Sequence, residues 1–386
     1  MSPRLPDSAK CCGCSACYAA CSVGAISMQP DEEGFLQPVV DGGKCIGCGK
    51  CEKVCPVLNP GVPRTPLSVY AAKAKDNELR RISSSGGVFS LLAREVLKKG
   101  GVIYGAVFEN DTHRLIHQSA ENEYELDALR GSKYVQSDMG DTFVRVKRNL
   151  DAGRYVLFSG CPCQVAGLRC FLGKEHVNLL LVDVICHAVP SPLAWQKYLS
   201  CLESKRKSKI IRVFSRRNCA WRECALSAEF MDSCDGEHLV ETVCDIYLRA
   251  FRADFFNRKC CHHCGYRSFR SGADITIGDF WGVEEFHPEI DDNEGVSAVI
   301  CATGKGEKAF LAVKNKTYCV SSLLQTVASH NKAVFGNHSA SKKRRIFFSE
   351  VSNMGFDDVV ERLLMPPWWY RMLRWIKWHM IRRSGE

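Results

Sequence analysis

Apolar runs of strand length alternate with helical segments between residues 69 and 185. The apolar runs are VYAAKAK (69–75), VIYGAVF (102–108), YVLFSG (155–160) and LLLVDVI (179–185). The helical segments are GVFSLLAREVLKKG (87–100), ELDALRG (125–131) and TFVRVKRNLDAG (142–153). This alternation predicts an α/β domain around a largely buried sheet.

The N-terminal part of the chain follows a different pattern. AISMQPDEEGFLQPVVD (25–41) has turn residues from Pro30 to Gly34 and alternating polar and apolar residues in 35–40, which predicts a β-hairpin. Beyond it, NPGVPRTP (59–66) holds three prolines and a glycine and predicts a stiff, extended linker. We therefore expect a small separate unit ahead of the α/β domain.

Cysteine is the unusual component of an otherwise ordinary globular composition. The 386 residues include 23 cysteines, with 46% hydrophobic and 25% charged residues. Disulfides do not explain this number, because residues 1–20 contain no apolar signal stretch and the total is odd. We expect a reducing compartment and a cytoplasmic location. No run of 18 or more apolar residues occurs, so no segment is expected to span a bilayer.

Two cysteine runs flank the predicted hairpin. CCGCSACYAAC (11–21) and CIGCGKCEKVCP (45–56) each contain four cysteines separated by two, two and three residues. This is the bacterial two-cluster ferredoxin spacing, in which three close thiolates bind one 4Fe-4S cluster and the fourth binds the other. Zinc sites usually show two CxxC pairs a dozen or more residues apart, so zinc is disfavoured here.

The spacing assigns four ligands to each of two 4Fe-4S clusters. Cluster one is expected to be held by Cys11, Cys14, Cys17 and Cys55, and cluster two by Cys45, Cys48, Cys51 and Cys21. Cys12 lies outside the spacing and is interpreted as a bystander.

Three loops of the α/β part carry distinctive residues. SSSGG (83–87) precedes a predicted helix, so its hydroxyls and backbone N–H groups could receive a phosphate, although a serine-rich helix cap explains it equally well. GSKYVQS (131–137) and SGCPCQVAGL (159–168) are less common sequences.

Five motifs together resemble the beta-subunit family of coenzyme F-420 hydrogenases and dehydrogenases. They are RRISSSGGVFSLLA, LRGSKYVQS, LFSGCPCQVAGL, VDVICHAVPSP and ADITIGDFWG, in the family's order. In many members a two-cluster ferredoxin module precedes the flavin domain. The resemblance implies a flavoprotein that binds FAD and at least one further 4Fe-4S cluster, and that passes electrons between iron–sulfur centres and a two-electron acceptor.

The resemblance also implies where the flavin binds. The expected cofactor-binding residues are Ser84, Ser85, Gly86, Gly87, Lys133, Tyr134, Asp279 and Trp281. Lys133 and Tyr134 are further expected to act in catalysis, by stabilising the anion of the reduced flavin or by positioning substrate. A structural cap and a packing tyrosine are the alternative.

A third cluster site follows from the same resemblance. Its expected ligands are Cys163, Cys186, Cys261 and Cys264, with Cys161 and Cys260 as adjacent alternatives. Zinc competes with iron–sulfur here, because KCCHHCGY (259–266) puts two histidines between cysteines and imidazole suits zinc.

The expected fold is an α+β ferredoxin-like two-cluster module followed by an α/β flavin-binding domain. Its expected parts are the two-cluster module (1–58), a proline-rich linker (59–67), the N-terminal (68–150) and C-terminal (151–335) parts of the flavin domain, the latter with the third iron–sulfur site, and a tail (336–386).

The function expected is that of an iron–sulfur flavin-dependent oxidoreductase. Clusters exchange single electrons while most organic acceptors take two, and a flavin converts one kind of transfer into the other. We expect a ferredoxin or a partner redox subunit as electron donor and a small molecule as acceptor. A non-catalytic electron-relay subunit and a zinc-stabilised binding protein are the alternatives.

Basic segments suggest two further kinds of partner. PPWWYRMLRWIKWHMIRR (366–383) predicts a basic amphipathic helix, either docked on protein or in peripheral contact with a membrane. The formal charge is +9, but ESKRKSK (203–209) and KKRR (342–345) lack interleaved aromatic residues, so no nucleic-acid partner is expected.

Overall fold

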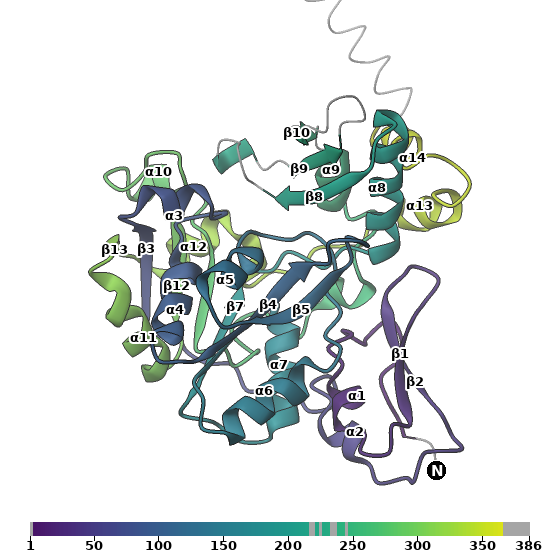
Figure 1. Cartoon of the computed structure of the whole chain (residues 1–386), viewed down its shortest axis with the longest axis horizontal. Helices are drawn as coiled ribbons and strands as arrows, with labels where there is room; N and C mark the ends of the chain where they lie inside the picture. The colour runs from purple at the N-terminus through teal and green to yellow at the C-terminus, as the bar shows by residue number, and fades with distance from the viewer. Residues whose placement is uncertain (1–2, 216–220, 224–225, 232–237, 244–245, 366–386) are drawn as a thin grey trace, which may run out of the picture.

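An eight-stranded sheet forms the centre of the computed structural model, which describes residues 3–215, 221–223, 226–231, 238–243 and 246–365 (Figure 1). The strand order is β13-β3-β12-β11-β7-β6-β4-β5. The strands are β3 (Ser68–Ala74), β4 (Val102–Phe108), β5 (Leu115–Ala120), β6 (Val156–Gly160), β7 (Leu179–Val184), β11 (Ile275–Asp279), β12 (Ser297–Cys301) and β13 (Thr317–Ser321). The central strands β4, β6, β7 and β11 run parallel, and the flanking strands join them antiparallel.

Helices cover both faces of this sheet, because side chains that alternate along buried strands point to opposite faces. Ile103 and Leu157 pack with the helices α4 (Val88–Leu97), α5 (Glu123–Leu129) and α11 (Gly304–Lys314). Their neighbours Tyr104 and Phe158 pack on the opposite face with α6 (Thr142–Asp151) and α7 (Pro162–Leu172).

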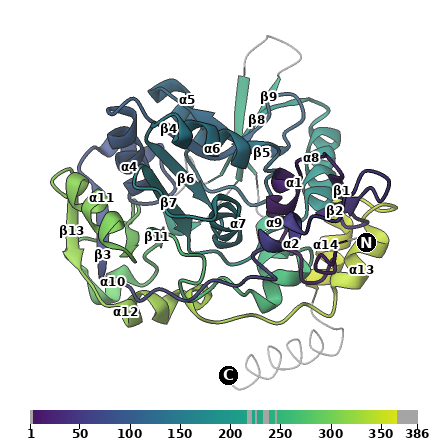
Figure 2. The ribbon, with the colours of Figure 1, turned by 90° about the horizontal axis from the view of Figure 1, so that it is seen from below.

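The N-terminal module stands beside α7 (Figure 2). It consists of α1 (Ala16–Ala20), the antiparallel hairpin β1 (Ile26–Pro30) and β2 (Leu36–Val40), and α2 (Lys50–Lys53). Asp31 closes the hairpin turn by accepting hydrogen bonds from the backbone N–H groups of Glu33 and Phe35. The hairpin predicted from the sequence is therefore present with its turn at the predicted place.

A second core, rich in aromatic residues, lies above the sheet in Figure 1. It is built from α8 (Pro192–Arg206), α9 (Ile246–Arg252), α13 (Arg344–Glu350), α14 (Phe356–Leu364) and the strands β8 (Ile210–Ser215) and β9 (Leu226–Met231). These two strands form a three-stranded sheet with β10 (His238–Val243). Trp195, Tyr198, Tyr247, Phe256 and Phe356 pack ring against ring at its centre. The first half of the expected tail thus belongs to a packed core.

Short elements complete the chain. They are the α-helices α3 (Asn77–Arg81), α10 (Val283–Phe286) and α12 (Leu324–His330), and the 3-10 helices η1 (Trp221–Glu223), η2 (Lys259–His263) and η3 (Lys332–Val334). Of these, η2 carries cysteines expected at the third cluster site.

The predicted strands and helices of residues 69–185 are all present, within a few residues of their expected ends. The two expected parts of the flavin domain both contribute strands to the one large sheet. The predicted amphipathic helix at 366–383 lies outside the described residues. Among the described residues, no helix combines the length and apolar character that crossing a bilayer requires.

Candidate functional site

Cysteines follow two neighbouring parallel strands at the edge where those strands end. β6 ends at Gly160 and leads into Cys161 and Cys163, and β7 ends at Val184 and leads into Cys186. Because the carboxyl ends of parallel strands meet at one edge, this is where open α/β sheets usually bind their ligands. The loop containing η2 brings further cysteines to the same edge.

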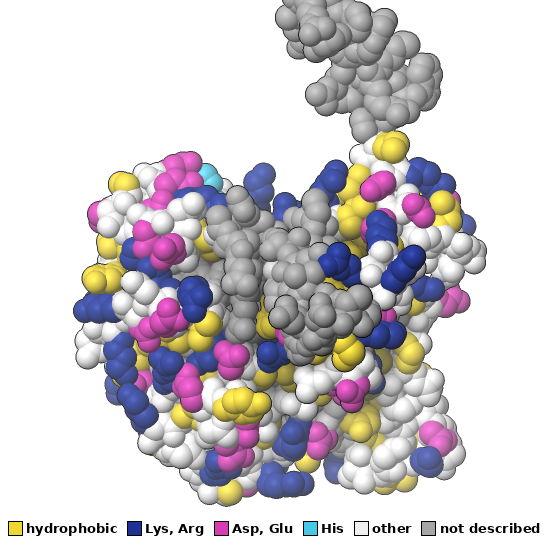
Figure 3. Space-filling view, turned by 45° about the horizontal axis from the view of Figure 1, so that its top comes forward, with side chains coloured by type: hydrophobic (Ala, Val, Ile, Leu, Met, Phe, Trp, Pro, Cys, Tyr) yellow, Lys and Arg dark blue, Asp and Glu magenta, His cyan; other side chains and the backbone are white. Residues whose placement is uncertain are grey.

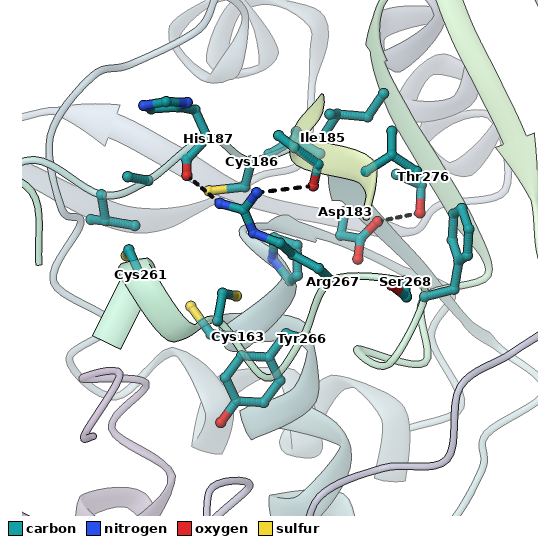
Figure 4. Close-up of a pocket in the computed structure, with 18 of the residues that line it drawn as sticks. Cys163, Asp183, Ile185, Cys186, His187, Cys261, Tyr266, Arg267, Ser268 and Thr276 are labelled. Carbon is teal, nitrogen blue, oxygen red and sulfur yellow. Dashed lines mark hydrogen bonds between the residues drawn. The ribbon is translucent and has the colours of Figure 1, made fainter. Parts of the chain in front are cut away.

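One pocket collects the four cysteines predicted for the third cluster (Figure 4). Cys163, Cys186, Cys261 and Cys264 all line it. The two alternatives lie just behind this wall, with the thiol of Cys161 against Cys186 and the thiol of Cys260 against Cys261. The structure therefore brings together four thiols from three loops, with the alternatives one contact away.

The remaining pocket wall is mostly apolar and contains two buried charged side chains. Arg267 donates from Nη2 to the carbonyl oxygen of His187 over 2.6 Å. Asp183 accepts hydrogen bonds from the hydroxyls of Ser271 and Thr276, each over 2.6 Å. Burial raises the pKa of Asp183 to about 6 in spite of these two donors.

Burial also acts on the thiols of the pocket. It raises the pKa of Cys264, while contact with Cys161 and burial together raise the pKa of Cys186 well above its ordinary value. Cluster ligands must be thiolates, so ionising these groups requires a positive centre among them. The donor set consequently fits a buried cationic cluster core.

The distances between possible ligand atoms argue against a four-cysteine zinc site. A tetrahedral zinc ion with Zn–S bonds of about 2.3 Å holds its thiolate sulfurs about 3.8 Å apart. In the described part of the chain, three possible ligand atoms come within 4.8 Å of one another at one place, and they belong to His187, Asp254 and His338. The pocket thiols are spaced more widely than a zinc site requires.

Ring stacking and a close histidine–carboxylate approach hold the histidine–aspartate group together. The rings of His187 and His338 stack at 4.2 Å, and Asp254 Oδ1 lies 3.0 Å from His338 Nε2. Arg267 lies 3.4 Å from Nδ1 of His338 and can only donate there, which assigns the ring proton to Nε2. A metal-bound imidazole needs that proton on its other nitrogen, so His338 is better described as paired with Asp254.

The thiols expected to hold cluster one gather in the N-terminal module. Burial, reinforced by neighbouring thiols, raises the pKa of Cys11 to about 11 and that of Cys17 to about 12. Cys55 is among the neighbours that act on Cys17, although it lies far along the chain. Cys14 also faces Cys17.

The thiols expected to hold cluster two lie toward the outside of the module. Cys21 and Cys51 share a small apolar cluster, and Cys48 is exposed. The module therefore has an outer end at Cys48 and an inner end that faces the α/β domain.

The inner end of the module packs directly on α7. A Cβ atom placed on Gly167 would lie 2.9 Å from the sulfur of Cys14. The hairpin tip is fixed independently, because the carboxylate of Glu33 forms a two-pronged ion pair with Arg344 of α13. Two separate contacts, one on α7 and one on α13, therefore hold the module in place.

A buried arginine joins the module to the α/β domain. Arg258 donates from Nε to the carbonyl oxygen of Cys11 over 2.8 Å and from Nη2 to that of Leu36 over 2.9 Å. Its Nη1 donates to Gln136 Oε1 over 2.7 Å. Burial alone would lower its pKa, but the thiols around it, Cys260 and Cys11 first, raise the pKa above the ordinary value.

The loops expected at the flavin site touch one another at the carboxyl edge of the sheet. The hydroxyl of Ser84 accepts a hydrogen bond from the backbone N–H of Ser132 over 2.5 Å. Ser85 lies 3.2 Å from the hydroxyl of Ser297, which also accepts from the backbone N–H of Gly86. Asp279 at the end of β11 is the register partner of Ser297. The three sequence motifs therefore occupy one continuous region.

The expected catalytic pair has structural partners. Lys133 donates from Nζ to the carbonyl oxygens of Arg130 over 2.7 Å and Gly131 over 3.3 Å. The ring of Tyr134 packs against Phe251 at 5.7 Å. Both side chains are partly buried. These contacts are of the kind expected if Lys133 is a structural cap and Tyr134 a packing residue.

The remaining expected flavin residues lie around Gly87 and η1. Gly87 has φ +79 and precedes α4, whose N-terminus receives no side-chain cap. Asp279 Oδ1 accepts a hydrogen bond from Trp221 over 2.9 Å, and the ring of Trp221 stacks on Trp281 at 4.9 Å.

Comparison with known families decides where the chain belongs. Two sequence models describe the beta subunits of coenzyme F420 hydrogenase/dehydrogenase. The model of their N-terminal part matches residues 69–143, and the model of their C-terminal part matches residues 153–325. The chain belongs to this family. Residues 10–59 match a "4Fe-4S dicluster domain", which confirms the predicted ferredoxin module.

Two relatives carry related names. The F subunit of F(420)H(2) dehydrogenase from Methanosarcina mazei is 24% identical over 339 residues, which cover 82% of this chain and 86% of the relative. A chain of the F-420-reducing NiFe hydrogenase complex from Methanosarcina barkeri is 14% identical, with 78% of this chain and 92% of that chain covered and a TM-score of 0.44. Membership of the coenzyme F-420 beta-subunit family, with its 4Fe-4S module, implies electron transfer.

Within this family member, the sequence interpretation missed two residues. Cys12 was interpreted as a bystander, yet its thiol is buried and contacts both Cys14 and Cys163. Arg258 was not predicted as a functional residue, because a single arginine in a basic chain carries no local signal. The doubled cysteine at 11–12 was the one visible hint.

Proposed function

We propose that the chain is an iron–sulfur flavoprotein oxidoreductase that passes electrons between its 4Fe-4S clusters and a two-electron acceptor through FAD. One observation carries the proposal. Cys12 and Cys14 of the ferredoxin module and Cys163 of the pocket pack in one buried cluster, so expected ligands of cluster one and of the pocket cluster meet across a single apolar interface.

The pocket is proposed to hold the third 4Fe-4S cluster. Cys163, Cys186, Cys261 and Cys264 would be its ligands. Three features support this: their number, their spacing beyond that of a zinc site, and the raised thiol pKa values that a cationic core would offset. Cys163 also stands in the first turn of α7, where the helix dipole favours the negative charge of a thiolate-bound cluster.

The proposed order of electron transfer follows from burial. Cys48 is exposed at the outer end of the module, whereas Cys14 is buried against α7. Electrons from a ferredoxin or a partner redox subunit would therefore reach cluster two first, then cluster one, then the pocket cluster. Transfer in the opposite direction would use the same path.

FAD is proposed to bind along the loops that gather beside Ser297. When bound, it supplies the conversion between one-electron and two-electron transfer. The backbone N–H groups at the start of α4 would receive phosphate, since no side chain caps them and the helix dipole favours an anion there. Lys133 would place a positive charge at this edge, and Trp281 an aromatic surface.

Two alternative functions would give a different cofactor content or activity in the same purified protein. A relay subunit would contain the clusters but would not turn over any acceptor alone. A zinc-stabilised binding protein would contain zinc at the pocket and no flavin. Family membership favours the redox alternatives over the zinc protein.

The deciding experiment is anaerobic purification with measurement of iron, sulfide, zinc and extractable flavin per chain. We expect about twelve irons, from three 4Fe-4S clusters, together with one FAD. Turnover of two-electron acceptors by the isolated chain would then separate the enzyme from the relay subunit. About eight irons with zinc and no flavin would refute the proposal.

The proposed partners are an electron-donating redox protein and a small-molecule acceptor, in the cytoplasm. Figure 3 shows basic and acidic side chains interspersed on the described part of one face. That no nucleic acid binds stays a prediction. Peripheral membrane contact through residues 366–383 stays a prediction. Liposome flotation of the full chain beside one ending at Leu364 tests it, and equal flotation would refute it.

A further inference from the structure

Arg267 is a buried arginine in the wall of the pocket that collects the four cysteines. It follows Cys264 closely in the chain and is 8% exposed. Figure 4 shows its guanidinium pointing toward the sulfur of Cys186. Because an arginine side chain is always charged in proteins, a full positive charge is buried in this wall.

The hydrogen-bond partners of this guanidinium are all neutral. Nη2 donates to the carbonyl oxygen of His187 over 2.6 Å and lies 3.4 Å from Nδ1 of the His338 ring. Nη1 donates to the carbonyl oxygen of Gly336 and, over 3.4 Å, to that of Ala333. In the described part of the chain, no carboxylate forms a hydrogen bond or an ion pair with Arg267.

A buried charge without an opposite partner costs free energy, so the pocket favours a negatively charged occupant. The carboxylate of Asp183 shares the pocket, but it is bonded to the hydroxyls of Ser271 and Thr276 instead. A 4Fe-4S cluster held by four thiolates carries an overall charge of about −2 when oxidised and about −3 when reduced. Its charge is therefore of the sign that the guanidinium lacks.

The charge of Arg267 also acts on the expected ligands. The Cys161 thiol and burial raise the pKa of Cys186, and Arg267 opposes this increase. Burial raises the pKa of Cys264, and Arg267 opposes that increase as well. The arginine thus favours the thiolate forms that iron binding requires.

One donor of the guanidinium has no partner. Nε of Arg267 is fully buried and meets no acceptor among the described residues. Buried N–H groups are nearly always hydrogen-bonded, so an unpaired one in a pocket wall indicates an acceptor that a ligand supplies. The sulfurs of an iron–sulfur cluster accept such hydrogen bonds.

The backbone beyond Arg267 helps to fix its side chain. Ser268 and Phe269 have φ values of 56 and 60, in the left-handed region that residues other than glycine rarely adopt. The backbone N–H of Ser268 donates to the carbonyl oxygen of Val334 over 3.0 Å. Such conformations persist only where the surrounding structure imposes them. Arg267 is therefore held between the loop after β7 and the segment around η3.

We propose that Arg267 binds the pocket cluster through its positive charge and its Nε–H group, and thereby raises the reduction potential of that cluster. The proposal deepens the proposed function and rests on the pocket holding a 4Fe-4S cluster. Reduction adds one electron, and so one negative charge, to the cluster. A fixed positive charge and a hydrogen bond to sulfur both stabilise that added charge.

The test compares Arg267→Gln and Arg267→Lys with Arg154→Gln. Arg154 is the control because it precedes β6, at the opposite end of that strand from the pocket, and pairs with Glu121. Each protein is purified anaerobically, and the pocket cluster is followed by EPR-monitored redox titration. Its signal is the one that disappears in Cys186→Ser together with about four irons.

We expect Arg267→Gln, which lacks the charge, to move the potential of the pocket cluster to a more negative value. The equilibrium constant for its reduction should fall about tenfold or more, which is about 59 mV for a one-electron couple. Arg267→Lys keeps the charge and should recover most of this loss. Arg154→Gln should titrate as wild type. A pocket cluster with the wild-type potential in Arg267→Gln would overturn the proposal.

A measurement on the unaltered chain covers the case in which the variants do not fold. The wild-type protein is made with ordinary arginine and with arginine that carries the heavy nitrogen isotope, and the reduced pocket cluster is studied by pulsed EPR. We expect a nitrogen coupling that changes with the isotope, because Nε would donate to a cluster sulfur. The absence of any arginine coupling at this cluster would overturn the proposal.

Iron content separates this proposal from the proposed function. If the wild-type protein holds about eight irons, the pocket cluster is wrong, and the role of Arg267 falls with it. About twelve irons, with an unshifted potential in Arg267→Gln and no arginine coupling, would leave the pocket cluster in place and overturn the role of Arg267 alone.

Discussion

Arg258 donates a hydrogen bond from Nε to the carbonyl oxygen of Cys11 over 2.8 Å. The arginine follows α9 in the chain and the cysteine opens the first cluster-binding run, so the bond crosses the boundary between the two modules. The guanidinium is 1% exposed and also lies 5.2 Å over the ring of Phe35. The ferredoxin module is therefore fixed against the α/β domain by more than its linker.

Replacing Arg258 should destabilise this docking. Arg258→Ala leaves the carbonyl oxygens of Cys11 and Leu36 and the amide of Gln136 without their donor, and removal of one partner from a buried charged network typically costs about 3–5 kcal/mol. Anaerobic denaturant unfolding measures the change. Arg81→Ala, at an exposed arginine, is the control and should leave the midpoint unchanged. Equal midpoints for the two variants would show that Arg258 does not hold the modules together.

Adding one methyl group to α7 should disturb cluster one. In Gly167→Ala the new Cβ would lie 2.8 Å from Cys14 Cβ and 2.9 Å from its sulfur, so the ligand must move. Overpacking of this kind costs about 1–3 kcal/mol, and we expect iron content to fall by up to about four per chain. Gly304→Ala is the control, because a Cβ there meets nothing within 4 Å. Unchanged iron and unchanged EPR spectra in Gly167→Ala would contradict the contact.

Asp183 should make stability depend on pH. Burial raises its pKa from 3.8 to about 6. Between pH 3.8 and about pH 6, the folded state therefore keeps a proton that the unfolded state has already lost. Unfolding free energy should therefore fall as pH rises through this window, by about 3 kcal/mol for two pKa units. Asp183→Asn, neutral throughout, should lack this fall.

Anaerobic urea unfolding between pH 4 and pH 8 measures the difference between wild type and Asp183→Asn. Asp111→Asn, at an exposed carboxylate, serves as the control and should follow the wild-type curve. Parallel curves for wild type and Asp183→Asn would mean that Asp183 is ionised throughout.

Local patterns in the sequence were enough to predict the elements of residues 69–185 and the dicluster module. The run VIYGAVF predicted β4 to the residue, and the cysteine spacing predicted the dicluster domain. The strands β11 to β13 were not predicted as elements, because each spans five residues and β11 and β13 mix polar with apolar residues. The contacts of Cys12 and Arg258 depend on which surface of the α/β domain the module meets, and no spacing within one segment encodes that contact.

Removing the outer cluster should slow reduction of the flavin by a protein donor but not by a small reductant. Cys48 is the exposed thiol among the eight expected ferredoxin ligands, all of which the structure describes. In Cys48→Ser we expect cluster two to be lost, so iron should fall from about twelve to about eight per chain. A reduced two-cluster ferredoxin should then reduce the flavin at least about tenfold more slowly, because its nearest acceptor becomes the buried cluster one. Dithionite is small enough to reach the remaining clusters, so its reduction of the flavin should change little.

Cys319→Ser on β13 is the matched control for this experiment and should behave as wild type with both reductants. Stopped-flow absorbance of the flavin follows each reaction under anaerobic conditions. If Cys48→Ser loses about four irons and the ferredoxin still reduces it at the wild-type rate, electrons do not pass through cluster two, and the proposed order is wrong. If both reductants slow equally, the variant has damaged the inner path rather than its outer end. Only a selective loss with the protein donor supports an order that starts at Cys48 and proceeds through Cys14 to Cys163.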